Sequence, residues 1–240
     1  MIYLAHTAHW QFLGLTVGAV AWILTMAATG LNEWRLWRLD DLSAVTSGVA
    51  WVGIWRACFY SHAFDGIENC RSIAFSDPFT PVEVATAQVL MVLALIFGLV
   101  GNVCGAVAMR MVYFSVEDRR NMRLAFVLAG TMYLVAGTLC LVSLAWNMSS
   151  VLNNSSINFP PEFHLPATPA SQQVGSAIAV GFIASILMLV SGLLFLCYRY
   201  AWTALSPEAP KDNGDPIYEH IQNGDNQGKD NPAFHSEELS

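Results

Sequence analysis

Residues 89–109 read VLMVLALIFGLVGNVCGAVAM, an apolar run without a single Asp, Glu, Lys or Arg. A helix needs roughly 20 apolar residues to cross a hydrocarbon core of about 30 Å, and this run is long enough. Inside lipid each backbone amide and carbonyl must be bonded within its own segment, which makes a helix the expected structure. The run therefore predicts a membrane-spanning helix.

Three more uncharged runs of 20 residues or more accompany it, at residues 10–29, 124–146 and 174–198. Only 12% of the 240 residues are charged, whereas a soluble domain carries about 25%. Core helices of a soluble protein are the alternative, but four such runs would leave too little polar surface to face water. We therefore expect a four-span membrane domain over residues 1–200, with helices at about residues 10–29, 81–112, 122–146 and 174–200.

Basic residues close to the helix ends predict the orientation. Arginines surround the connection between the second and third runs, and Arg199 follows the fourth, which places these ends in the cytoplasm. No Lys or Arg precedes Trp10, so the first run lacks the basic start of a cleaved signal and is expected to be retained. Both termini are thus expected to be cytoplasmic, with extracellular loops at residues 30–88 and 147–173.

The first loop carries strand and helix-start signals. Residues 34–39 and 49–55 alternate in period two and are rich in Trp and Val, which predicts strands. Trp51 and Trp55 have even spacing and are expected on one face of a strand. Residues 80–83, Thr-Pro-Val-Glu, fit a capping box and predict that the second helix begins at Pro81.

Two of the five cysteines, Cys58 and Cys70, lie in the expected extracellular loops. Because that side of the membrane is oxidising, we expect them to form a disulfide. A metal site would need three or four ligands, and His62 alone between the cysteines does not supply them. No metal is therefore expected.

The second loop and the C-terminal segment differ in composition. Phe159 and Phe163 flank two prolines, which favours a stiff turn with aromatic residues either exposed or packed on the first loop. Asn147, Asn153 and Asn154 each fit the N-x-Ser pattern for glycosylation. Residues 201–240 hold eight acids and two lysines and few apolar residues, so a disordered acidic cytoplasmic tail is expected.

Small and polar residues inside the runs predict helix contacts. Gly14 and Gly18, and likewise Gly101 and Gly105, are four apart, which allows helices to approach closely. Asn102 is expected to form a hydrogen bond between helices. No charged residue lies within a span, so neither a proton relay nor a voltage sensor is predicted.

Several of these residues together resemble a known family. Trp34, Gly53-Ile54-Trp55, Cys58 and Cys70 match, in order, the W…G-L-W…C…C signature of the claudins, with Ile54 in place of Leu. The resemblance covers about residues 3–200, and peripheral myelin proteins and calcium-channel γ subunits share the signature. It implies an all-α membrane protein, with a left-handed four-transmembrane-helix bundle and a small extracellular antiparallel β-sheet.

The resemblance implies a structural and adhesion role at tight junctions of the plasma membrane. Claudins polymerise side by side in one membrane and meet claudins of the next cell, sealing the paracellular space or selecting ions. The implied partners are the chain itself, other claudin-like proteins and the lipid bilayer. Neither an enzyme activity, a cofactor nor nucleic-acid binding is expected. An auxiliary subunit that regulates another membrane protein is the alternative, and a small transporter is a further one.

The resemblance also suggests roles for single residues. Arg71 follows the second cysteine, where a charged residue can set pore charge, although the loop as a whole is acidic. Phe159 and Phe163 occupy the loop that meets the opposing cell. Trp55 either fills the core of the sheet or anchors the sheet to the bundle. Cys197 is a candidate for palmitoylation.

The chain departs from the family pattern at several points. The terminal Ser240 lacks the apolar side chain that a PDZ domain captures, so scaffold binding is doubtful. Gln88 stands where many claudins carry Arg. Residues 218–221 and 231–234 resemble sorting signals. These features indicate a divergent member.

Overall fold

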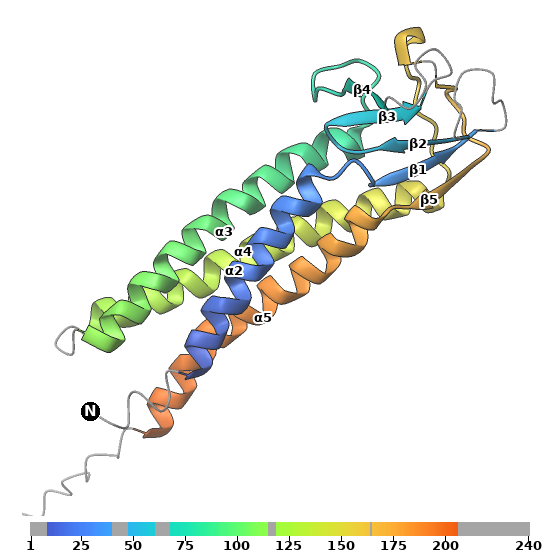
Figure 1. The fold of residues 1–240 in the computed structure, drawn as a ribbon. Helices are drawn as coiled ribbons and strands as arrows, with labels where there is room; N and C mark the ends of the chain where they lie inside the picture. Colours follow the sequence, from blue (N-terminus) through green and yellow to red (C-terminus); the bar gives the residue numbers. More distant parts are fainter. Residues whose placement is uncertain (1–8, 40–47, 61–67, 115–118, 164, 206–240) are drawn as a thin grey trace, which may run out of the picture. The chain divides into compact units, whose positions relative to one another are not determined.

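Four helices dominate the computed structural model, which describes residues 9–39, 48–60, 68–114, 119–163 and 165–205. All described elements belong to the unit Met1–Leu205, and the second unit, Ser206–Ser240, lies outside the described residues. Each helix contains a stretch long and apolar enough to cross a membrane, so the four-span prediction is confirmed (Figure 1). They are α2 (His9–Gly30), α3 (Val82–Phe114), α4 (Arg119–Leu152) and α5 (Ser176–Leu205).

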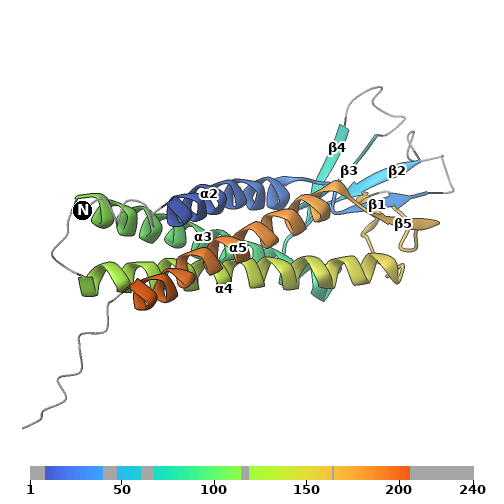
Figure 2. The ribbon, with the colours of Figure 1, turned by 90° about the horizontal axis from the view of Figure 1, so that it is seen from below.

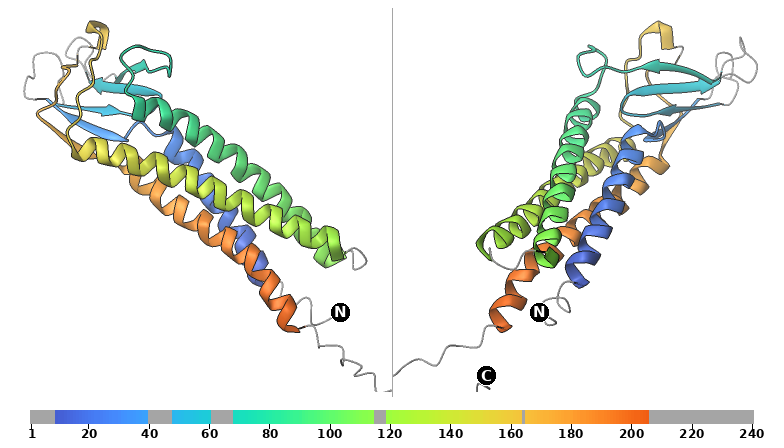
Figure 3. Two further views of the ribbon diagram at one scale, coloured as in Figure 1. Left: turned by 180° about the vertical axis from the view of Figure 1, so that it is seen from behind. Right: turned by 60° about the vertical axis from the view of Figure 1, so that its left-hand side comes forward.

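The helices run side by side as a four-membered bundle (Figure 2). Each helix makes its main contacts with two neighbours, in the cyclic order α2, α3, α4, α5. The start of α2, the end of α5 and the adjacent ends of α3 and α4 lie away from the sheet (Figure 3). At 1.5 Å per residue the 33 residues of α3 span about 50 Å, longer than the hydrocarbon core alone.

Small residues face inward along α2, whereas large apolar residues face outward. Gly14, Gly18 and Ala21 are buried, but Trp10 is 64% exposed and Ile23 is 56% exposed. A soluble protein rarely leaves so much contiguous apolar surface uncovered. Lipid is the environment that suits this distribution, because interhelical contacts in membranes favour small residues.

Tyr133 of α4 fills the space that glycines leave at the bundle centre. A Cβ atom on Gly18 would lie 2.5 Å from Cζ of Tyr133, and one on Gly101 would lie 3.2 Å from its Cδ1. The Tyr133 hydroxyl donates a hydrogen bond to Oδ1 of Asn102 at 2.9 Å. The predicted interhelical bond of Asn102 is therefore confirmed. These glycines make room for an aromatic ring, whereas the closest backbone approach between two described helices lies elsewhere.

That backbone approach joins α4 and α5. A Cβ atom on Gly130 would lie 3.0 Å from the carbonyl oxygen of Gly192, and one on Gly192 would lie 2.9 Å from that of Gly130. The two positions are 62 residues apart, so no local spacing pattern could reveal them.

A five-stranded antiparallel sheet lies at one end of the bundle, in the order β4-β3-β2-β1-β5 (Figure 1). The first two strands confirm the strands predicted from period-two patterning. Strand β5 was not predicted, and it pairs with β1 through the register Arg35↔Val174. The sheet thus unites the segment before α3 with the segment before α5. The strands are β1 (Arg35–Arg38), β2 (Val49–Val52), β3 (Arg56–Tyr60), β4 (Glu68–Ser72) and β5 (Ser171–Val174).

Several predicted boundaries were wrong. Helix α4 continues to Leu152 instead of ending at residue 146, because the polar side chains of Asn147 and Ser150 are buried and bonded rather than solvated. Helix α5 begins at Ser176, since Val174 belongs to the sheet, and it continues through Leu205 into the expected tail. Residues 206–240, with both sorting-like patterns, lie outside the described residues.

Candidate functional site

The candidate site is the sheet and its attachment to the bundle, which one disulfide stabilises. Cys58 of β3 and Cys70 of β4 are directly opposite in register and form the predicted disulfide. Among the described residues, their sulfurs and the carboxylate of Glu68 form the one candidate metal cluster. Both sulfurs are consumed by the disulfide, so this cluster offers no thiolate to a metal.

Trp34 connects the sheet to α2. Its indole is 1% exposed, and its Nε1 donates to the carbonyl of Ala28 at 2.9 Å. Gly53 allows the turn after β2 to approach the same region, because a Cβ atom there would lie 2.9 Å from Cα of Asn32. Ile54 is 1% exposed in the core that the sheet shares with the helix ends. Trp34, Gly53 and Ile54, three of the six signature positions, therefore form one packed junction.

The structure contradicts one of the two interpretations of Trp55, the one that places its side chain in the core of the sheet. Strand β2 ends at Val52, so Trp55 lies in the turn before β3 and does not share a strand face with Trp51. Its side chain is 39% exposed, so the interpretation as sheet core was wrong. Trp51 is half-buried against Tyr60, with ring centroids 5.5 Å apart.

Gln88 of α3 is bonded to two loop carbonyls. Its Nε2 donates to the carbonyl oxygens of Ile54 at 2.5 Å and Ile73 at 2.9 Å. Gln88 is 2% exposed, so these bonds satisfy carbonyls that water does not reach. The neutral amide thus connects the β2–β3 turn and the segment after β4 to the start of α3.

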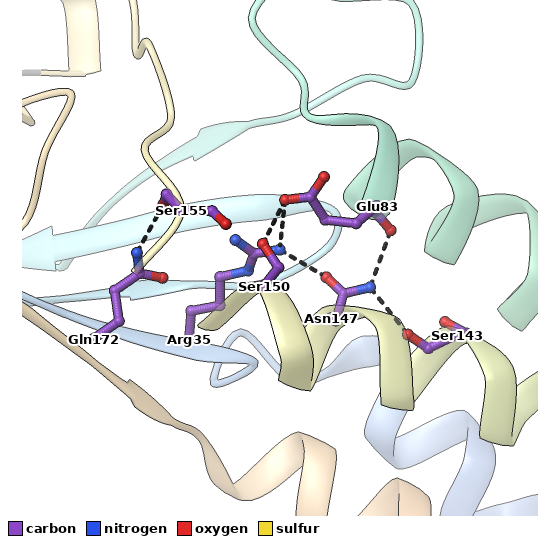
Figure 4. Close-up of polar contacts among 7 residues, drawn as sticks. All are labelled: Arg35, Glu83, Ser143, Asn147, Ser150, Ser155 and Gln172. Atoms are coloured by element: carbon purple, nitrogen blue, oxygen red, sulfur yellow. Dashed lines mark hydrogen bonds and ion pairs between the residues drawn. The ribbon is translucent and has the colours of Figure 1, made fainter. Parts of the chain in front are cut away.

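A buried polar group, which we term the junction cluster, ties β1 to α3 and α4 (Figure 4). It comprises Arg35, Glu83, Asn147 and Ser150. The Arg35 side chain is 1% exposed, and its Nη2 donates to Oδ1 of Asn147 at 2.9 Å and lies 3.4 Å from Oε1 of Glu83. Burial lowers the pKa of Arg35, and the charge of Glu83 opposes that effect. An arginine stays protonated regardless, so the cluster holds a buried positive charge.

The other bonds of the junction cluster hold its anion in place. The Ser150 hydroxyl donates to Oε1 of Glu83 at 2.6 Å. Asn147 Nδ2 donates to the backbone carbonyls of Glu83 at 2.9 Å and Ser143 at 3.1 Å. These additional bonds offset part of the cost of burying the ion pair, and Nη1 of Arg35 has no hydrogen-bond partner among the described residues. The cluster was not predicted; the polar pair Asn147 and Ser150, one helical turn apart after an apolar run, was the available signal.

The predicted capping box at the start of α3 was wrong. The Thr80 hydroxyl donates to the carbonyl of Ala74 at 2.8 Å, and the Thr80 amide donates to the carbonyl of Asp77. Glu83 turns toward the junction cluster instead of back to Thr80. The predicted start at Pro81 was nevertheless within one residue of the observed start, because α3 begins at Val82.

Phe159 and Phe163 pack inward, so the expected exposed aromatic tip is not formed. The ring of Phe159 lies edge-on to Trp37 of β1, with centroids 5.4 Å apart. Phe163 stacks on Phe159 at 5.5 Å, contacts Phe79 and is 5% exposed. The alternative expectation, that these rings pack on the first loop, is confirmed by their contacts with Trp37 and Phe79. A contact with an opposing cell through them would require the rings to leave this cluster.

Arg71 and Cys197 are both accessible. Arg71 lies on the edge strand β4, opposite Ala57, and is exposed. Cys197 is exposed on α5, toward the end away from the sheet. Their accessibility suits the suggested roles in ion preference and palmitoylation, which stay predictions.

A four-helix bundle of membrane length that carries a disulfide-tied antiparallel sheet at one end defines a tetraspan membrane protein. The family model described as PMP-22/EMP/MP20/Claudin tight junction matches residues 19–197, and the chain belongs to this family.

Curated relatives agree with this assignment. Claudin-3 of Rattus norvegicus is 25% identical over 214 residues, covering 85% of this chain and 91% of the relative. Claudin-2 of Bos taurus is 28% identical, with coverages of 87% and 84%, and claudin-5 of Mus musculus is 28% identical, with 85% and 94%. The protein is thus a multi-pass membrane protein of the claudin, tight-junction type, a structural class rather than an enzyme class.

Proposed function

We propose that this protein polymerises in the plasma membrane and adheres to copies on the next cell, sealing the paracellular space or selecting ions within it. The observation that carries the proposal is the junction cluster. Arg35 holds β1 to α3 and α4 through Glu83 and Asn147, while the disulfide holds β3 to β4. A sheet fixed in this way to a membrane-embedded bundle is a platform that neighbouring copies can contact in a defined orientation.

We further propose that the sheet is extracellular and that both termini are cytoplasmic. The exposed Arg110 of α3 and Arg123 of α4 lie at the end away from the sheet, where basic residues mark the cytoplasm. The Cys58–Cys70 disulfide at the other end suits an oxidising compartment. In this orientation the sheet meets the space between cells.

The proposed partners are the chain itself and other claudins, in the same membrane and across the gap. Strand β4 forms one edge of the sheet and presents the exposed side chains of Glu68, Arg71 and Ser72. Outward apolar residues on the helices, such as Ile23, give the bundle surface for lipid or for a neighbouring copy.

Expression of the full chain in cells that lack junction strands tests the proposal. Freeze-fracture and super-resolution imaging should show intramembrane strands at contacts between expressing cells, and none in the parent cells. Diffuse or intracellular protein without strands would contradict polymerisation and favour the auxiliary-subunit alternative. A Glu83→Ala variant, which weakens the junction cluster without altering the lipid-facing surface, should form fewer strands than the wild type at equal surface expression.

A further inference from the structure

Two N-x-Ser sequons overlap just after the end of α4, and a third lies inside the helix. They begin at Asn153, Asn154 and Asn147. The structure distinguishes these three asparagines. Asn147 is 1% exposed, and its Nδ2, the atom that would carry a sugar, donates to the carbonyls of Glu83 and Ser143. A glycan at Asn147 is incompatible with the folded chain.

Asn154 closes the C-terminus of α4. It adopts a left-handed φ of 49°, its amide donates to the carbonyl of Val151, and the amide of Ser155 donates to that of Ser150. These two bonds form the Schellman motif, in which an asparagine often replaces glycine. The Asn154 side chain is also engaged, since its Oδ1 accepts a hydrogen bond from the backbone amide of Gln172 in β5 at 3.1 Å.

Asn153 differs from both. Its side chain is exposed, and within the described part of the chain no group bonds its side-chain amide, while its backbone amide donates to the carbonyl of Ser149. Ser155 supplies the sequon hydroxyl. Among the described residues its hydrogen bonds are made by its backbone, to the carbonyl of Ser150 and from Nε2 of Gln172. A glycan on Asn153 therefore leaves every bond of the helix end and of β5 intact.

We propose that Asn153 carries an N-linked glycan. The inference rests on the proposed orientation, because the transfer takes place on the lumenal side of the membrane. Nδ2 of Asn153 forms a bond to C1 of the first sugar of a lipid-pyrophosphate-linked oligosaccharide. The bond from C1 to the pyrophosphate oxygen breaks, the lipid pyrophosphate leaves, and the amide loses one proton. Asn153 lies about 10 Å beyond Trp146 along the helix, clear of the apolar run.

Enzymatic deglycosylation of the full chain from animal cells tests the proposal. Peptide N-glycosidase F converts the carrier asparagine to aspartate, and peptide mass spectrometry should locate that conversion at position 153. The enzyme should lower the apparent mass of the wild type and of Ser156→Ala, which removes only the sequon of Asn154. It should leave Ser155→Ala and Asn153→Gln unchanged. Ser149→Ala, which removes only the sequon of Asn147, should behave as wild type.

Two results would overturn the proposal: conversion at position 154 or 147, or no mass change in any variant. A separate measurement tests the proposed orientation independently of the proposed glycan. Alkylation without reductant reports whether Cys58 and Cys70 are disulfide-bonded in the cell. Bonded cysteines with no glycan would refute the glycan alone, whereas free thiols would refute the proposed orientation as well.

Discussion

Nη2 of Arg35 in β1 lies 2.9 Å from Oδ1 of Asn147 in α4, and the two residues are 112 positions apart. A single side-chain bond thus joins the first strand of the sheet to the third membrane span. Both side chains are buried. If either one is removed, no water molecule can take its place as hydrogen-bond partner of the other.

Asn147→Ala should destabilise the protein by about 1–3 kcal/mol, the cost of leaving a buried polar group unsatisfied. Arg35 would lose an acceptor, and the Glu83 carbonyl would lose a donor. The thermal unfolding midpoint of detergent-purified protein measures the effect. Ser149→Ala, two residues along on the exposed side of α4, should leave the midpoint unchanged. Equal midpoints for both variants would contradict a role of the cluster in stability.

Glu83→Ala should cost more, about 3 kcal/mol, because removal of one member of a buried ion pair leaves the other charge uncompensated. The 15% exposure of the Glu83 side chain places the cost at the lower end of the range for such pairs. Glu68→Ala removes an exposed acid from β4 and is the control. If the denaturation curves of the two variants superimpose, the stability of the protein with Arg35 buried does not depend on Glu83.

Gly18→Ala should destabilise the bundle by about 1–3 kcal/mol through overpacking. The added methyl would meet the Tyr133 ring and the Ser191 hydroxyl, at 2.5 and 2.7 Å. Gly30→Ala, on the same helix, has no atom within 4 Å of the new methyl and should match or slightly exceed the wild type. Thermal unfolding in detergent compares the two variants, and a tolerant Gly18→Ala protein would argue against a tightly packed Tyr133.

Cys58→Ser should lower stability by roughly 2–4 kcal/mol, since the disulfide closes a loop between residues 12 apart. Limited proteolysis at the cell surface should cleave the variant faster in the sheet, because β3 and β4 lose their covalent tie. Cys104→Ser removes a free cysteine of α3 and should resist protease like the wild type. If Cys58→Ser is cleaved at the same rate as the wild type, the backbone pairing of the strands suffices to protect the sheet from protease without the disulfide.

Arg71→Asp should shift paracellular selectivity toward cations, because a cation on the edge strand repels cations and an anion there attracts them. Dilution potentials across epithelial monolayers that express each variant measure the preference. Arg110→Asp makes the same charge change at the far end of α3 and should leave selectivity as in wild type. An Arg71→Asp monolayer with unaltered ion preference would remove this residue from the pore hypothesis.

The membrane spans could be predicted because the hydrocarbon core acts on every residue of a run, so uncharged stretches such as 89–109 are legible without any tertiary knowledge. The end of helix α4, which lies beyond Asn147, could not be predicted in this way. Polarity normally ends a span, but here the amide and the Ser150 hydroxyl are satisfied by a glutamate 64 and 67 positions away. A partner so distant leaves no local trace.

The strands of the sheet also differ in whether the sequence alone predicts them. Strand β1 contains the apolar Leu36 and Trp37, whereas β5 consists of Ser171, Gln172, Gln173 and Val174. Strand β5 forms because β1 offers it backbone partners. Trp55 was misplaced because the period-two run continues past Val52 while the strand does not: the Gly53 amide bonds back to Arg56 and turns the chain. The disulfide was predictable because only two cysteines lie in the loops.

The pairing of β5 with β1 also has a mechanical consequence. Part of any tension applied to β5 passes through its backbone hydrogen bonds into β1. From there Arg35 transmits the load to two separate spans. The two loops are therefore mechanically coupled through the paired strands β1 and β5, in addition to the covalent connections that each loop has to its own helices.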